Sequence, residues 1–103
     1  MRAKRTDKNH RAIGDAMRAM GWAVKSLHTQ GGGVEDFLVG ISTASGKRWV
    51  LVEAKSPRYK LTASTAVRFT PAQREWYAQT EGFPRLVVTS AQDAVDKLRR
   101  MVG

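Results

Sequence analysis

The chain has 103 residues, of which 42% are hydrophobic, and this predicts one globular domain spanning residues 1–103 with a modest core. No cysteine is present, so disulfides and thiolate zinc sites are excluded, and no apolar run reaches the roughly 18 residues of a membrane span. With 18 Lys and Arg against 9 Asp and Glu, the net charge of +9 favours a polyanionic partner.

Nucleic acid is the commonest polyanion for so basic a domain, and its phosphates supply affinity that falls as salt rises. An anionic membrane is the rival partner. A membrane-surface helix pairs a basic face with bulky apolar residues, whereas the positive charge here is spread over the whole chain, so we favour nucleic acid. The basic first residues have no apolar stretch behind them, unlike a signal peptide, so we expect a cytoplasmic protein without membrane contact.

The first predicted element is a helix over residues 7–20, with Thr6 or Asp7 as its N-cap and Gly21 as its stop. Its apolar residues follow the helical i, i+3, i+4, i+7 spacing: Ile13, Ala16, Met17 and Met20. A strand over residues 22–28 comes next, and a run of three glycines ends it.

Two runs rich in β-branched and aromatic residues, 36–42 and 48–55, are separated by a turn of hairpin length and predict two antiparallel strands. Because the connection is short, the start of the first strand and the end of the second lie at the same end of the hairpin. This places Asp36 near Glu53. Lys55 is two residues beyond Glu53 on an extended strand, so both side chains point to the same face.

Residues 56–69 are polar, basic and without a clear period, which predicts a long loop. A helix over residues 71–80 follows, with Thr70 as its N-cap and a proline at its first position. Residues 85–90 predict a fourth, central strand. The last helix begins after Ser90 and packs through its apolar positions: Ala91, Ala94, Val95 and Leu98.

The resulting αβββαβα order, with its acidic motif, resembles the PD-(D/E)XK nucleases, whose site is written as an acid, a spacer and then acid-x-Lys. Asp36 matches the first acid, and Glu53, Ala54 and Lys55 match the acid-x-Lys. Glu35 replaces the usual proline, which sets backbone shape and donates no ligand. Nearly the whole chain is similar to compact phage-type members of the VRR-NUC and Holliday-junction-resolvase kind, through the stretches DKNH, SLHTQGGGVEDFLVG, WVLVEAKS, FTPAQREWY and LVVTSAQDAV.

The resemblance implies an α/β, restriction-endonuclease-like core, in which helices flank a mixed four-stranded sheet whose last strand joins in parallel. It implies a metal-dependent DNA endonuclease, selective for branched DNA such as four-way junctions, that works in the host cytoplasm if a phage encodes it. Mg²⁺, for which Mn²⁺ substitutes, prefers hard oxygen ligands, here Asp36, Glu53 and the Ala54 carbonyl. Lys55 would orient or deprotonate the attacking water.

Several of these residues also fit a purely structural interpretation. Asp36 and Glu53 are consistent with solvated strand-end charges that Lys55 neutralises. Gln73 fits a capping box with Thr70, and in the family a glutamine at this place lies beside the metal site, so both roles are compatible. Four residues share one face of the predicted helix: Gln73, Trp76, Tyr77 and Thr80.

Many relatives offer a further acid from the first helix, and Ala12 stands where that acid would align. Asp7, one turn earlier, is our preferred substitute, although it also fits a cap. Asp15, nearly one turn later, is the other substitute and equally fits an ion pair with Arg11 or Arg18.

The cations predicted to track DNA lie in the long loop: Arg58, Lys60 and Arg68. Residues 31–33, all glycine, fit either a close approach to phosphate or a plain turn, and His28 fits either a ligand or a loop hydrogen bond. We expect a homodimer, because opposed cuts in a two-fold symmetric junction require two sites. Some large aromatic residues would then lie in the interface, from the set Trp22, Trp49, Trp76, Tyr77 and Phe83. The alternative function is a basic DNA-binding module that retains the nuclease fold without significant catalysis.

Overall fold

The computed structural model describes residues 3–27, 33–55 and 70–103, with the side chains of the first helix described from residue 8 onward. In these ranges the elements follow the predicted αβββαβα order. They are α1 (Ala3–Ala19), β1 (Ala23–Ser26), β2 (Phe37–Thr43), β3 (Gly46–Ala54), α2 (Pro71–Gln79), β4 (Arg85–Val88) and α3 (Ala91–Val102). The predicted long loop at residues 56–69 lies outside the described residues.

The described strands form one mixed sheet in the order β1-β2-β3-β4. The first three strands make an antiparallel meander, and β4 joins β3 in parallel, with Val52 opposite Leu86. The sheet is therefore mixed and four-stranded, as predicted. The prediction of a central fourth strand is wrong: the meander already occupies one side of β3, so β4 pairs with its free edge and becomes an edge strand.

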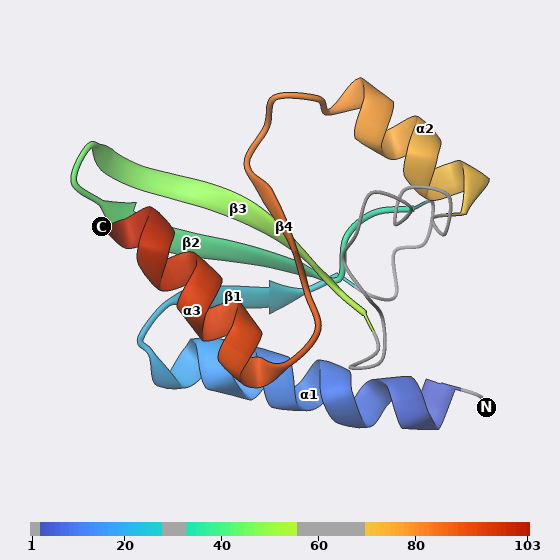
Figure 1. Ribbon diagram of the computed structural model, residues 1–103, viewed down its shortest axis with the longest axis horizontal. Helices are drawn as coiled ribbons and strands as arrows, with labels where there is room; N and C mark the ends of the chain where they lie inside the picture. Colours follow the sequence, from blue (N-terminus) through green and yellow to red (C-terminus); the bar gives the residue numbers. More distant parts are fainter. Residues whose placement is uncertain (1–2, 28–32, 56–69) are drawn as a thin grey trace.

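Helices α1 and α3 pack against each other and cover one face of the sheet, whereas α2 lies apart from them (Figure 1). Along β3, Val50 and Val52 are fully buried beneath the two helices, while Trp49 and Glu53 alternate with them and point to the opposite face. The core combines residues from α1, three strands and α3: Ile13, Met17, Phe37, Val39, Ile41, Val50, Val52, Val88, Ala94 and Leu98.

Helix α1 is longer than predicted. It begins at Ala3, so neither Thr6 nor Asp7 is its N-cap, and Asp7 lies inside the helix. The added residues include alanine, lysine and arginine, which are strong helix formers, and no glycine or proline interrupts them. Gly21 follows the helix with a φ of 88°, which suits its predicted role as a stop. Met20, predicted to pack, is 41% exposed.

The β2–β3 hairpin is antiparallel, as predicted, and its turn is tight. Thr43 pairs with Gly46, which leaves Ala44 and Ser45 as the two turn residues. The Thr43 hydroxyl accepts a hydrogen bond from the Ser45 N–H at 3.2 Å and donates one to the Gly46 carbonyl at 2.7 Å. Because the turn fixes the register, it also fixes which residues meet at the far end of the hairpin.

Helices α2 and α3 begin at the predicted caps. The Thr70 hydroxyl accepts a hydrogen bond from the Gln73 N–H at 3.1 Å, and the Ser90 hydroxyl accepts one from the Asp93 N–H at 3.0 Å. Each cap satisfies one of the amide donors that a helix leaves open at its start. Within the described ranges, no helix combines the length and the apolar character needed to cross a bilayer.

Candidate functional site

The end of the hairpin opposite its turn brings the predicted acids together. Phe37 pairs with Val52, so Asp36 and Glu53 adjoin the same rung of the sheet. The Asp36 carboxylate accepts the Ala54 N–H at 2.8 Å through Oδ2 and thus extends the β2–β3 contact to the residue before β2. The backbone and side chain of Asp36 are both held in place, since its carbonyl also accepts the Leu27 N–H at 2.6 Å.

Glu53 is a carboxylate in an unfavourable place for a negative charge. Its side chain is buried, with 6% exposure, and its pKa is raised from 4.5 to about 7. Burial is the largest cause, because it disfavours the charged form, and the like charge of Asp36 adds to the rise. Lys55 and a hydrogen bond from Gln73 oppose it. Among the described residues, burial and the charge of Asp36 therefore outweigh the stabilisation of the Glu53 carboxylate by Lys55 and Gln73.

Lys55 lies beside Glu53, as the acid-x-Lys spacing predicts. Its Nζ is 3.5 Å from Glu53 Oε2, and its side chain is 18% exposed. Its backbone is fixed from two sides: the N–H donates to Val88 O at 2.8 Å, and the carbonyl accepts Asn9 Nδ2 at 3.0 Å. Asn9 also donates to Thr89 O at 3.2 Å, so a residue of α1 ties the ends of β3 and β4 together.

Gln73 forms its predicted capping box and also contacts Glu53. Its Oε1 accepts the Thr70 N–H at 3.0 Å, which completes the capping box, while its Nε2 donates to Glu53 Oε2 at 3.0 Å. The side chain is only 8% exposed, and the cap fixes the direction of its amide. The start of α2 is thereby attached to the end of β3.

Gly33 shows what the glycine run does next to this helix. Its φ is 81°, and a Cβ built there would lie 2.4 Å from Ala72 O, so only glycine lets the chain pass this close to the start of α2. At Gly33, glycine is therefore required by the packing of the chain against α2. The other two glycines of the run and His28 lie outside the described residues.

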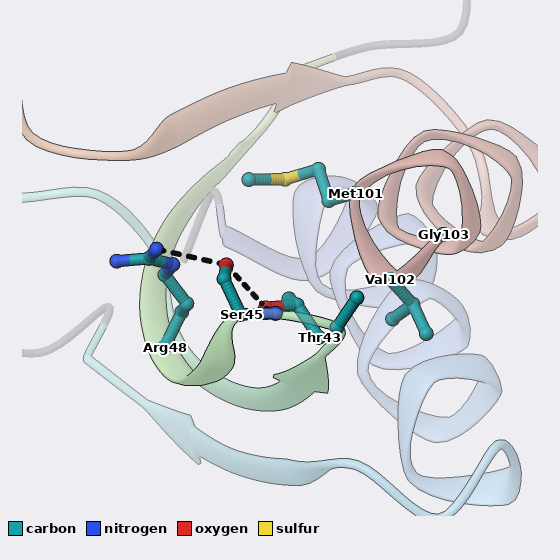
Figure 2. Close-up of a pocket in the computed structure, with 7 residues that line it drawn as sticks. Thr43, Ser45, Arg48, Met101, Val102 and Gly103 are labelled. Atoms are coloured by element: carbon teal, nitrogen blue, oxygen red, sulfur yellow. Dashed lines mark hydrogen bonds between the residues drawn. The ribbon is translucent and has the colours of Figure 1, made fainter.

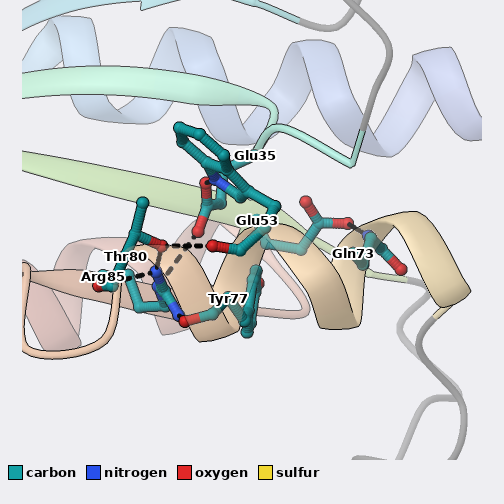
Figure 3. A network of polar contacts seen from close by, with 7 residues as sticks. Glu35, Glu53, Gln73, Tyr77, Thr80 and Arg85 are labelled. Atoms are coloured by element: carbon teal, nitrogen blue, oxygen red, sulfur yellow. Dashed lines mark hydrogen bonds and ion pairs between the residues drawn. The ribbon is translucent and has the colours of Figure 1, made fainter.

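A second polar group, missed by the sequence analysis, surrounds Glu35 on the same side of the molecule (Figure 3). Glu35 is completely buried and accepts the Trp76 Nε1–H at 2.7 Å. Arg85 Nε lies 3.1 Å from Glu35 Oε2, an ion pair without hydrogen-bond alignment. Arg85 also donates to the Thr80 hydroxyl and stacks 3.9 Å above the Tyr77 ring. Burial raises the pKa of Tyr77, and the charge of Glu35 raises it further, so the phenol stays neutral.

Of the two acids predicted on α1, only Asp15 has a described side chain. Asp15 is solvated, with its side chain 67% exposed, and pairs with Arg18 at 3.4 Å, which confirms its structural interpretation. The side chain of Asp7 and the three loop cations, Arg58, Lys60 and Arg68, lie outside the described residues. Within those residues, no three His, Asp or Glu side chains gather as a metal-binding group.

A cavity of about 440 Å³ lies at the other end of the sheet, between the β2–β3 turn and the end of α3 (Figure 2). Its polar residues come from the turn and from Arg48, whose Nη2 donates to Ser45 Oγ at 3.0 Å. Met101 and Val102 supply an apolar wall. No carboxylate side chain is among its lining residues, so the cavity offers no acidic group of the kind found around Glu53.

Comparison of the chain with protein-family models, with curated proteins and with solved structures found no match. The functional argument therefore rests on geometry. Four predicted site residues from three segments of the chain meet at one place: Asp36, Glu53, Lys55 and Gln73.

Proposed function

We propose that the protein is a metal-dependent DNA endonuclease that hydrolyses phosphodiester bonds, with branched DNA such as four-way junctions as its substrate. The observation that carries the proposal is the buried Glu53 carboxylate. It has a like-charged neighbour in Asp36 and a raised pKa, and Lys55 and Gln73 are in contact with it. Strongly shifted carboxyl groups with specific charged neighbours are a recurring feature of catalytic sites.

A magnesium ion fits the donor set at this end of the sheet. Two carboxylates and the Ala54 carbonyl supply hard oxygen ligands, and Mg²⁺ keeps several waters, so it requires few protein ligands. Among the described residues, Gln73 and Lys55 both approach Glu53 at Oε2. When bound, the ion would polarise the phosphate and lower the pKa of a coordinated water, and Mn²⁺ would substitute for it.

The protein side chains have separate tasks in this proposal. Asp36 and Glu53 bind the ion, and Gln73 orients Glu53 through its hydrogen bond to Oε2. Lys55 lies next to Glu53, where it would orient the attacking water as an ammonium or accept its proton as a neutral amine. DNA is attracted by the net charge of +9, with Arg58, Lys60 and Arg68 as proposed phosphate contacts.

A homodimer would supply the two sites that opposed cuts in a four-way junction require. Three of the aromatic residues considered for its interface are used within the fold: Trp22 packs against the core, and Trp76 and Tyr77 lie around Glu35 and Arg85. Trp49 and Phe83 are 63% and 65% exposed. Light scattering tests the proposal, and a mass near 11.4 kDa with and without DNA would contradict it.

The decisive experiment compares labelled single-stranded, duplex, flap and four-way DNA in magnesium and in EDTA. We expect magnesium-dependent cleavage that is strongest on the four-way DNA and abolished by Glu53→Gln. Asp15→Asn is the matched control, because it removes an acid that is exposed and paired with Arg18. DNA binding without cleavage would reject the proposed activity and leave a basic DNA-binding module. Cleavage that survives Glu53→Gln would reject Glu53 as part of the active site.

A further inference from the structure

The sheet face that points away from α1 and α3 carries an exposed aromatic residue. Trp49 lies on this face because its neighbour Val50 is buried in the core, and the indole-bearing side chain is 63% exposed. The register places Gly40 directly beside Trp49 and Ala23 beside Gly40. Of the three neighbouring residues Ala23, Gly40 and Trp49, only Trp49 therefore has a large side chain.

The missing side chain at Gly40 lets the indole lie over the strand. A Cβ built at Gly40 would lie 3.1 Å from Trp49 Cζ3 and 3.5 Å from Cε3. The ring therefore rests against the β2 backbone, where any larger residue would crowd it. Glycine inside a strand weakens the strand, and it often marks a close approach by another group. Here Gly40 lets the indole of Trp49 pack against the β2 backbone while much of the side chain stays in solvent.

The charge around Trp49 indicates the kind of partner. Lys47, two residues before Trp49 on β3, and Lys25, two residues after Ala23 on β1, are exposed on the same face. Glu53 is the only acidic residue within β1, β2 and β3. An apolar partner would have to desolvate both lysines, whereas a polyanion gains from them. An exposed aromatic ring between cations is the arrangement that binds a nucleobase and its flanking phosphates.

Trp49 also lies in line with the candidate active site. It precedes Glu53 by four residues on the same face of β3, which corresponds to about 13 Å at roughly 3.3 Å per residue. Nucleotides in a stacked strand rise by about 3.4 Å each, so a base over Trp49 would lie about four nucleotides from a phosphate at Glu53.

We propose that Trp49 stacks on an unpaired base of a single-stranded DNA segment, while Lys25 and Lys47 contact its phosphates. A paired base inside a duplex is already stacked on both faces, so the partner is an unpaired segment of a branched or frayed substrate. This inference rests on the proposed nuclease function and extends it. It names an unpaired DNA segment that would run from the cleavage site along β3 to Trp49. The binding itself requires neither metal nor catalysis.

The test is fluorescence anisotropy of a labelled oligothymidylate of 12 nucleotides, measured in EDTA so that no cleavage occurs. Trp49→Ala should weaken binding by roughly 5- to 150-fold, the range for loss of one stacked base, and Trp49→Phe should retain most of the affinity. Phe83→Ala is the matched control, because Phe83 is equally exposed but belongs to the turn before β4. On an abasic oligonucleotide of the same length, Trp49→Ala should bind as the unchanged protein does.

Several results would overturn the inference: no binding of the oligothymidylate by the unchanged protein, an equal loss in Phe83→Ala, or an equal loss on the abasic strand. A lower molecular mass for Trp49→Ala without a change in DNA affinity would also overturn it and indicate a protein interface. The two proposals fail separately. If magnesium-dependent cleavage is absent but Trp49→Ala still loses affinity in EDTA, only the nuclease function is rejected; normal cleavage with unchanged affinity rejects only the stacking site.

Discussion

Two buried glutamates lie against α2, and their surroundings differ in how completely they balance the charge. Glu35 is fully buried and has an arginine at 3.1 Å together with the Trp76 N–H. Glu53 has a lysine at 3.5 Å and an amide, but it also has the like charge of Asp36 close by, and its pKa is raised to about 7. We therefore assign Glu35 a structural role, whereas Glu53 is the carboxylate at which we propose that a cation binds.

The largest effect should come from removing Glu35, whose charge is balanced by Arg85. Glu35→Ala leaves Arg85 buried without its carboxylate and removes the acceptor of the Trp76 N–H, so we expect the free energy of unfolding to fall by about 3–5 kcal/mol. Glu53→Ala should cost much less, because it also relieves repulsion with Asp36. Urea denaturation in EDTA measures both. Equal losses for the two variants would remove the distinction between the glutamates.

The pH dependence of stability should come from Glu53. Its pKa is higher in the folded protein, about 7, than its ordinary value of 4.5, so the folded state binds the proton more tightly. Without metal, the contribution of Glu53 to stability should therefore be fully present below pH 4.5 and should fall by ~3 kcal/mol as the pH rises to about 7.

Urea denaturation in EDTA across this pH range measures the effect, with Glu53→Gln as the comparison. Glutamine does not titrate, so most of the decline should disappear in that variant. A decline of the same size in Glu53→Gln would assign the effect to other groups.

Loss of Lys55 should reduce cleavage without reducing magnesium binding, unlike loss of a carboxylate. Lys55→Ala leaves both acidic ligands in place, so magnesium binding and DNA affinity should persist, since one cation of 18 alters the salt dependence by about one phosphate contact. Single-turnover cleavage should fall by roughly 100-fold or more, the usual scale for a group that activates the nucleophile. Lys8→Ala, which removes an exposed lysine of α1, is the control. Cleavage at the unchanged rate would reject the acid-x-Lys interpretation.

Magnesium should stabilise the folded protein by binding to Asp36 and Glu53. A ligand that binds only the folded state raises stability by about 2.7 kcal/mol at 100 times its Kd, so the Tm should rise with magnesium. The rise should vanish in Asp36→Asn, which removes a proposed ligand, and persist in Asp15→Asn, which removes a solvated acid. Thermal unfolding with and without magnesium measures it. An equal rise in both variants would mean that Asp36 does not bind the ion.

The contacts of Glu35 and of Glu53 also differ in how well the sequence predicts them. Asp36 and Glu53 meet because they belong to one hairpin with a short turn, and hairpin register is a local property that the sequence carries. The capping box that fixes Gln73 is written in four consecutive residues, whereas its place beside Glu53 is expected only from the resemblance to the nuclease family. Local rules therefore predict the proximity of Asp36, Glu53 and Lys55 and the cap at Thr70.

Contacts between distant segments were not predictable in the same way. Glu35 and Arg85 are 50 positions apart, and neither the helical nor the strand period links them. Asn9 reaches backbone carbonyls of Lys55 and Thr89, which no spacing in the sequence indicates. The edge position of β4 has the same origin, because an apolar run predicts a buried strand without stating which side of β3 is free.

The smallest predicted effect concerns α2, which contacts Glu53 through Gln73 and Glu35 through Trp76. Thr70→Ala and Ser90→Ala each remove the cap of one helix, so each should lower the free energy of unfolding by about 1 kcal/mol. Only Thr70→Ala also loosens the start of α2, from which Gln73 reaches both the cap and Glu53. We therefore expect a several-fold loss of cleavage in Thr70→Ala alone, because Glu53 would be held less firmly beside the ion. Chemical denaturation and single-turnover cleavage of the two variants provide the comparison. If Ser90→Ala loses as much activity, the effect reflects general stability, and α2 has no separate part in orienting Glu53.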